Sequence, residues 1–467
     1  MQQVDTLVSR NAGWAAKSVT TLPHLAKTLA RIAFGATIVL LPFHARVVLA
    51  ARTVDTIYGD YTDFLAFGSD LFLIATLGCW LVNRVAERRR VQIGPLFLAI
   101  PIAGITLMAV ISSIVSVDPA LSIYNSIRLL LLDGLYLYIV NEIKSTSEII
   151  LPLAGMVTLQ ALVGIMQVLQ QHSIGWQSLG ELELDPAWSG VSIVWANGVR
   201  SLRAYGLSDH PNILGGCFAF GLILLATWFL QTDSYRRTLI GAVFALGTIG
   251  LFLTFSRAAW LATGLAITWI VLFLYRTRQI HALQDTAALL GAAFILVLPY
   301  ALHSIDFVGA RLDAQDSFNL VAIETRSVTE RVTLNEAANR IFADHALLGI
   351  GIGALPQALR TAEPDFAFNY QPAHIAFLDA AAETGILGGL AYLLVLVAPW
   401  IALWFYRRRL VFSPELAGVS GLLLALTLVG LFDYYTWLLA PGRLLQWMAW
   451  GLWAVAFTQS LAGARNA

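Results

Sequence analysis

The chain contains little charge and almost no cysteine, and these shortages define its class. Only 12% of its 467 residues are charged, 58% are hydrophobic, and the formal net charge is zero. A soluble domain carries about 25% charged residues, so a soluble globular protein is excluded. Nucleic-acid partners need a basic surface, and none is expected here. The two cysteines, Cys79 and Cys217, lie far apart in apolar segments, which predicts core residues rather than a disulfide or metal pair.

Long apolar runs are what the chain has in abundance. Runs of about 20 apolar residues recur along its length, each long enough to cross a hydrocarbon core of about 30 Å. They are continuous rather than alternating, which excludes a transmembrane β-barrel. We therefore expect an all-α polytopic membrane protein with about twelve transmembrane helices. Their expected centres are residues 41, 74, 105, 132, 159, 220, 246, 266, 293, 395, 424 and 450.

The first expected span is the weakest, because His44 and Arg46 interrupt it. No short apolar stretch followed by a small-residue cleavage site precedes it, so no removable signal peptide is expected.

Basic residues indicate the orientation of the chain, because they fall on the N-terminal tail and on every second connection. The positive-inside rule places these short segments in the cytoplasm, together with both termini. The residues concerned are Arg10, Lys17, Lys27, Arg31, Arg84, Arg88, Arg89, Arg90, Lys144, Arg236, Arg237, Arg276, Arg278, Arg407, Arg408 and Arg409.

Two connections on the other side are long, and they divide the chain. Residues 1–302 would carry nine spans with one outer loop near 170–208, residues 303–373 a large outer loop, and residues 374–467 three spans. Within the large loop, "TERVTLNEAANRIFADHALLGIGIGAL" has apolar residues at helical spacing. Asp344 and the glycines after it would end that helix. A large, ordered, helical loop on the periplasmic side is therefore expected.

Every cation expected on this outer side is an arginine. A guanidinium matches phosphate oxygens with two hydrogen bonds, whereas lysine offers a point charge. Arg257 lies in "TFSRAAW" between two apolar runs, where a cation needs an anionic partner unless it only reaches for the membrane surface. A phosphate or pyrophosphate carried by a membrane lipid fits best. The arginines are Arg200, Arg203, Arg257, Arg311, Arg326, Arg331, Arg340 and Arg360.

Two stretches place further polar residues at helix starts. In "GVRSLRAYGLSDHPNILGG", Ser208 or Asp209 would cap a helix with Pro211 in its first turn. In "QPAHIAFLDAAAETGILGG", His374 is either a structural hydrogen-bonding group or a base. Glu383 follows about two and a half helical turns later, too far to orient it. Glu383 is expected to pair with an arginine or to cap a break at Thr384–Gly385.

Four motifs in one order resemble the O-antigen ligase and polymerase family of bacterial envelopes. They are R-x-x-G…H-P-N over Arg203–Asn212, S-R-x-x-W over Ser256–Trp260, D-H-A-L-L-G-I-G-I-G over residues 344–353, and H-x-x-x-L…E-T-G-I-L-G over His374–Gly388. The resemblance covers roughly residues 200–400 and the twelve-span topology. Ile375 replaces the family's usual asparagine, and the usual tryptophan after Arg331 is absent.

This resemblance implies a membrane glycosyltransferase of GT-C-like fold in the bacterial inner membrane. It would transfer a glycan from undecaprenyl diphosphate to the lipid A–core oligosaccharide at the periplasmic face, with membrane lipids as its other partners. His374 would activate the acceptor hydroxyl. The diphosphate would be held by Arg200, Arg203, Arg257, Arg331 and His210, with Asn212, Tyr205 and Glu383 in support.

No cofactor or metal is expected, because the outer carboxylates are scattered without ligand spacing, and arginines can stabilise the same charge. With no carboxylate placed as a nucleophile, a single displacement with inversion is expected.

Two other interpretations remain open. An O-antigen polymerase or protein O-oligosaccharyltransferase would use the same donor with another acceptor. A lipid-linked-sugar flippase would place ionisable groups near the bilayer midplane. Only Arg128 and Asp133 are expected that deep, as a pair, which favours the enzyme.

Overall fold

The computed structural model describes residues 23–232, 235–312 and 318–466. Residues 23–40 are helical. The further helices are α2 (Gly68–Ala86), α3 (Leu96–Ser112), α4 (Pro119–Glu142), α5 (Ile150–Gln170), α6 (Pro211–Phe229), α7 (Tyr235–Leu253), α8 (Arg257–Arg276), α9 (Ile280–His303), α10 (Ile305–Leu312), α11 (Phe318–Asp344), α12 (Leu355–Ala362), α13 (Ala376–Tyr406), α14 (Pro414–Gly430), α15 (Tyr435–Leu438) and α16 (Ala440–Asn466). Two antiparallel hairpins pair β1 (Arg46–Ala50) with β2 (Phe64–Phe67) and β3 (Ile193–Ala196) with β4 (Val199–Leu202).

The described chain is a helical, multi-pass membrane protein, as its apolar runs predict. Eight of its described helices are long and apolar enough to cross a membrane, and α3 and α14 are shorter apolar helices. The expected number of about twelve spans remains a prediction. Helix α6 is the most enclosed of the eight candidates, with 83% of its apolar window buried. It therefore forms the centre of the bundle, against α5, α7, α8 and α14.

The structure corrects the position of the first expected span. The helix there ends at residue 40, and the chain continues as β1, so residue 41 is not a span centre. The physical reason lies in His44 and Arg46, whose side chains both contact the carboxylate of Asp209. Asp209 consequently does not cap α6, and neither does Ser208. The cap is His210, whose Nδ1 accepts from the backbone N–H of Asn212.

Three of the apolar helices begin with the same local signal, a polar cap followed by proline. Asp118 caps α4, His210 caps α6 and Ser413 caps α14, and a proline occupies the first turn in each case. Proline lacks an N–H group, which a first-turn residue would leave unpaired, and its fixed φ suits a helix start. These sequences therefore fix where each helix begins.

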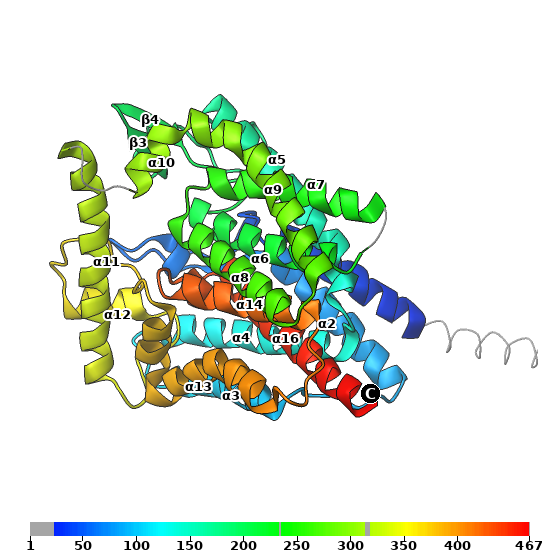
Figure 1. The fold of residues 1–467 in the computed structure, drawn as a ribbon. Coiled ribbons are helices and arrows are strands. Elements are labelled where there is room, and N and C mark those ends of the chain that lie inside the picture. Colours follow the sequence, from blue (N-terminus) through cyan, green and yellow to red (C-terminus); the bar gives the residue numbers. More distant parts are fainter. Residues whose placement is uncertain (1–22, 233–234, 313–317, 467) are drawn as a thin grey trace, which may run out of the picture.

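The long connections gather at one end of the bundle, here called the loop end. Figure 1 shows α10, α11, α12 and the β3–β4 hairpin together at this end. The first helix, residues 23–40, and the C-terminal part of α16 lie toward the opposite end. The large loop is helical, as expected, and α11 ends at Asp344.

Helix α13 breaks at the loop end, close to where the sequence predicts a break. Gly385 has φ 72° and ψ −179°, which interrupts the helical backbone. The glycine-rich stretch after α11 packs into this break, because Ile350 N donates to Ala382 O and Gly351 N donates to Glu383 O. Gly349, at φ +73°, lies so close that an added Cβ would sit 2.5 Å from the Glu383 backbone. The break thus needs glycine on both sides.

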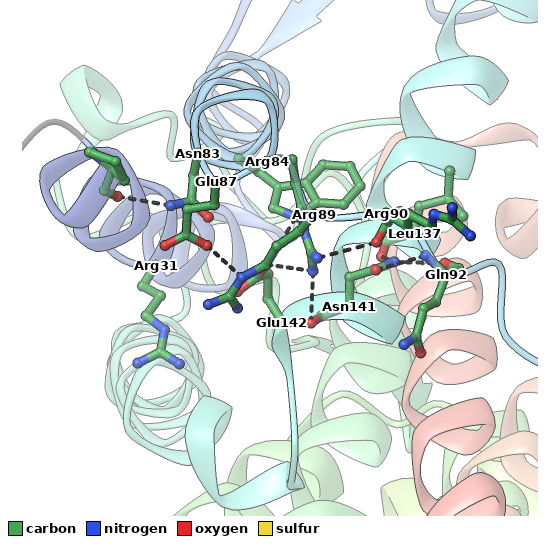
Figure 2. A network of polar contacts seen from close by, with 12 residues as sticks. Arg31, Asn83, Arg84, Glu87, Arg89, Arg90, Gln92, Leu137, Asn141 and Glu142 are labelled. Atoms are coloured by element: carbon green, nitrogen blue, oxygen red, sulfur yellow. Dashed lines mark hydrogen bonds and ion pairs between the residues drawn. The ribbon is translucent and has the colours of Figure 1, made fainter. Parts of the chain in front are cut away.

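The opposite end is closed by a buried ion pair. Figure 2 shows Arg84 of α2 reaching the end of α4, where it pairs with Glu142 at 2.8 Å and donates to the Asn141 carbonyl. Asn141 in turn exchanges two hydrogen bonds with the backbone of Gln92. Arg84 is therefore buried and structural, although the sequence marks it only as a basic loop residue.

The expected pairing of Arg128 with Asp133 is wrong. Arg128 pairs with Asp70 at 2.9 Å and donates to the carbonyl of Leu65, while Asp133 accepts a hydrogen bond from Trp447 Nε1 at 2.9 Å. Five positions apart on α4, the two side chains point toward different neighbours. Both are held by tertiary contacts that the local sequence does not reveal.

Gly349→Ala should destabilise the protein, because the new Cβ meets backbone atoms and the positive φ disfavours any side chain. A loss of about 2 kcal/mol or more is expected from strain of this kind, read as a lower melting temperature in detergent. Gly264→Ala is the matched control, because nothing lies within 4 Å of its added Cβ. Equal melting temperatures for the two variants would contradict the packing described here.

Candidate active site

A cavity of about 450 Å³ opens at the loop end around His374. It is called the histidine cavity here. Six parts of the chain line it: the β1–β2 connection, Gly190 before β3, the start of α6, the middle of α11, the segment before α13 and the segment after α14. Residues distant in sequence therefore meet around one imidazole.

His374 is held by its backbone, and its ring faces the cavity. Its N–H donates to Asn335 Oδ1 of α11 at 2.8 Å. The preceding residue, Ala373, donates to Asp379 Oδ1, also at 2.8 Å. The ring Nδ1 is buried and has no hydrogen-bonding partner within the described chain. Because His374 also lines the cavity, its imidazole can contact a ligand bound there.

A polar chain runs beside the imidazole and ends in Asp433. Arg203 donates to Asn212 Oδ1 at 2.7 Å, and Asn212 Nδ2 donates to Asp433 Oδ2 at 3.1 Å. Arg203 is only 3% exposed and also donates to the Thr254 carbonyl and to Ser192 Oγ. Its guanidinium is thus used to fix Asn212, which in turn fixes the carboxylate of Asp433.

Both histidines of the cavity are held in their neutral form. Burial lowers the pKa of His374 to about 4, Arg331 lowers it further, and Asp433 opposes that shift. Burial, followed by the charge of Arg203, lowers the pKa of His210 to about 3. Near neutral pH, each ring can therefore accept a proton. His210 already uses Nδ1 to cap α6, which leaves His374 as the candidate base.

A second cavity of about 260 Å³ adjoins the first and is lined by three arginines, Arg257, Arg311 and Arg331. It is called the arginine cavity here. Helix α8 begins at Arg257, so its N-terminal dipole adds positive potential. Leu261 and Phe432 supply an apolar edge. Phosphate oxygens beside a hydrocarbon chain fit this combination.

The two cavities share three lining residues, Asn212, Arg331 and Asp433. An anion in the arginine cavity would therefore lie next to the imidazole of His374. This adjacency is what a group transfer from a phosphate requires, because the leaving group and the base must flank one reacting atom.

The structure brings together some of the expected site residues and not others. His374, His210, Asn212 and Arg331 line the histidine cavity, and Arg257 lines the arginine cavity. Arg200 lies exposed on β4, where it donates to the carbonyls of Ala187 and Trp188, and lines neither cavity.

Two of the expected supporting residues, Tyr205 and Glu383, line neither cavity and contact other parts of the protein. Tyr205 accepts from the backbone N–H of Ser192 at 2.6 Å. Glu383 is buried in α13 and accepts from Trp437 Nε1 at 2.7 Å. Its carbonyl also receives the glycine loop at the α13 break, close to the break expected at Thr384–Gly385.

Sequence reasoning missed Asp433 and Tyr434, and it counted Arg311 only among the outer arginines. Asp433 lies in "GLFDYYTW", directly after an apolar run, and an acidic residue there is the signal that was available. Among the described residues, no group of three His, Cys, Asp or Glu side chains could hold a metal ion. Metal independence itself remains a prediction.

Comparison with known proteins points to the same part of the chain. The family model described as O-antigen ligase matches residues 242–393. This range contains Arg257, Arg311, Arg331 and His374, the arginines of the second cavity and the candidate base. No curated protein matches the chain. The match confirms the resemblance that the motifs predict: over residues 242–393 this chain is similar to the O-antigen ligase family.

Proposed function

We propose that this protein is an O-antigen ligase, which transfers a glycan from undecaprenyl diphosphate to the lipid A–core oligosaccharide. The observation that carries the proposal is the shared wall of the two cavities, where Arg331 and Asp433 adjoin both the arginines and His374. The loop end would face the periplasm, with both termini in the cytoplasm and the helices in the bacterial inner membrane.

The donor's diphosphate belongs in the arginine cavity. Arg257, Arg311 and Arg331 supply guanidinium groups there, and the N-terminus of α8 adds its dipole. Leu261 and Phe432 offer an apolar path for the first part of the polyprenyl chain. Fixed positive groups can stabilise the charge that develops on a leaving diphosphate, so transfer without a metal ion is expected.

The chemical step is a single displacement at the anomeric carbon. His374 takes the proton of the acceptor hydroxyl, and the oxygen forms a bond to that carbon. The bond from the carbon to the diphosphate oxygen breaks, and its electron pair leaves with the diphosphate. Asp433 stabilises the imidazolium, while Arg203 acts through Asn212 as a positioning residue. Inversion at the anomeric carbon follows from one displacement.

Two alternative functions remain, one with the same donor site and one without a transfer reaction. An O-antigen polymerase or a protein O-oligosaccharyltransferase would use the same donor site, and only the acceptor distinguishes them. A lipid-linked-sugar flippase is disfavoured because Arg128 and Asp133, the two charges expected near the bilayer midplane, are engaged by Asp70 and Trp447.

The function is tested with purified protein in nanodiscs, a lipid-linked glycan donor and a lipid A–core glycolipid acceptor. The wild type should form capped lipopolysaccharide in the presence of EDTA, with an inverted linkage by NMR. His374→Ala should lower the rate by about 100-fold or more, as expected when a general base is lost. His172→Ala, an exposed histidine of the other long loop, is the matched control.

Near wild-type transfer by folded His374→Ala protein would rule out the base assignment. Retention of the donor's anomeric configuration would rule out the single displacement. If the wild type extends a second lipid-linked glycan but never caps lipid A–core, the polymerase alternative replaces the ligase.

Arg257→Lys and Arg331→Lys should weaken donor binding by about 10-fold to 100-fold, because lysine loses the two-point geometry that a phosphate prefers. Arg360→Lys, on α12 at the same end of the molecule, is the control, because Arg360 lines neither cavity. Donor affinity can be measured with fluorescent lipid-linked glycan. Unchanged affinity in both cavity variants would exclude the arginine cavity as the diphosphate site.

The acid limb of the pH profile should report the low pKa of His374. A base acts when deprotonated, so kcat/KM for the donor should stay level down to the region of pH 5 and fall as the pH approaches about 4. Asp433→Asn removes the charge that raises this pKa, so the remaining activity of the variant should fall off at a still lower pH than that of the wild type. A limb at about pH 6.5 would indicate an imidazole in an ordinary aqueous environment.

A further inference from the structure

The histidine cavity carries a row of aromatic rings among the residues that it does not share with the arginine cavity. Tyr58 lies 6.5 Å from Tyr61, Tyr61 lies 6.1 Å from Tyr434, and Tyr434 lies 5.2 Å from the His374 ring, all between centroids. Tyr58 is 57% exposed, whereas His374 lies at the inner end. The row, here called the tyrosine row, therefore leads from the surface to the candidate base.

The tyrosine row is held by contacts between distant segments. Tyr58 and Tyr61 lie in the connection between β1 and β2, and Tyr434 follows α14. The hydroxyls of Tyr61 and Tyr434 share a hydrogen bond of 2.5 Å. Gln357 of α12 donates to the Tyr61 carbonyl. A preformed surface of this kind orders few side chains when a ligand binds.

Carboxylates accompany the rings. Asp60 and Asp209 line the same cavity, and Arg46 pairs with both. The side chain of Asp60 is 47% exposed, so its oxygens remain accessible to a ligand. A sugar presents hydroxyl donors at its edge and C–H groups on its face. Carboxylate acceptors beside phenol rings offer a partner to each.

We propose that the tyrosine row and Asp60 form the acceptor subsite, which holds the terminal sugar of the acceptor glycan against the β1–β2 connection. This inference rests on the proposed function and names where its second substrate binds. Displacement with inversion brings the acceptor oxygen to the anomeric carbon from the side opposite the diphosphate. With the diphosphate beside Arg257 and Arg311, the acceptor lies on the tyrosine side of His374.

The charges that line the two cavities also distinguish the donor from the acceptor. Asp60 and Asp209 would repel a diphosphate, and they accept hydrogen bonds from a neutral sugar. The β1–β2 hairpin also lies outside residues 242–393, the range matched by the family model, whereas Arg257, Arg311, Arg331 and His374 lie inside it. The matched range thus carries the proposed donor groups and the base, and the hairpin, outside that range, would add the acceptor surface.

The test compares Tyr58→Ala with Tyr275→Ala in full-length protein in nanodiscs. Both tyrosines are well exposed, 57% and 68%, but Tyr275 lies at the far end of α8. With lipid A–core glycolipid and lipid-linked glycan as substrates, Tyr58→Ala should raise KM for the acceptor roughly tenfold, a usual effect of losing an aromatic contact. Its KM for the donor should stay within about twofold of wild type. Tyr275→Ala should match the wild type.

Asp60→Asn is the second variant, because it keeps the shape of the side chain and replaces the charged carboxylate with a neutral amide. Like Tyr58→Ala, it should raise KM for the acceptor glycolipid and leave KM for the donor unchanged. For a variant too slow to assay, binding of the acceptor glycolipid without donor is measured instead, and a loss of affinity is expected.

An unchanged acceptor KM and affinity in both variants would overturn the proposal, as would an equal rise in KM for the donor. If the proposed function is wrong, the wild type itself will not cap lipid A–core. The two variants and the wild type are then compared with the glycan acceptor that the wild type does use, and KM for that acceptor tests the subsite.

Discussion

The amide of Asn212 connects the parts of this site, and the geometry of the rest depends on it. Its oxygen accepts from Arg203, and its nitrogen donates to Asp433. Arg203 lies before α6 and Asp433 after α14, so the amide ties the central helix to the C-terminal part of the bundle. An amide whose oxygen accepts one hydrogen bond and whose nitrogen donates another has one orientation. The carboxylate beside His374 is therefore fixed in position before any substrate arrives.

A second constraint places His374 itself. The segment before α13 is anchored to α11 by Asn335 and to α13 by Asp379, and α11 is continued by the glycine-rich stretch that enters the α13 break. The break, the loop and the imidazole thus form one packed unit. Glycine at 349 and 385 matters to the chemistry only through this packing, which allows two backbones to approach more closely than side chains would permit.

The sequence predicts local features well and long-range contacts poorly. Apolar runs give the helical class, and a proline after a polar cap marks the starts of α4, α6 and α14. The break at Gly385 is visible as a polar and glycine interruption. By contrast, Asp209 reads as a helix cap and instead binds His44 and Arg46, more than 160 positions away. Arg200 and Arg311 look alike as outer arginines, and only the folded loops put Arg311 at a cavity.

The charge of Arg331 acts on both the proposed diphosphate site and the candidate base. Arg331 lines both cavities, and its charge helps to lower the pKa of His374. A diphosphate bound beside Arg331 would bring negative charge close to both groups and offset that effect. The pKa of His374 would then rise toward its ordinary value, and the imidazole would become a stronger base with the donor in place. On the proposed function, base strength is thus coupled to donor binding through one guanidinium, without any movement of the backbone.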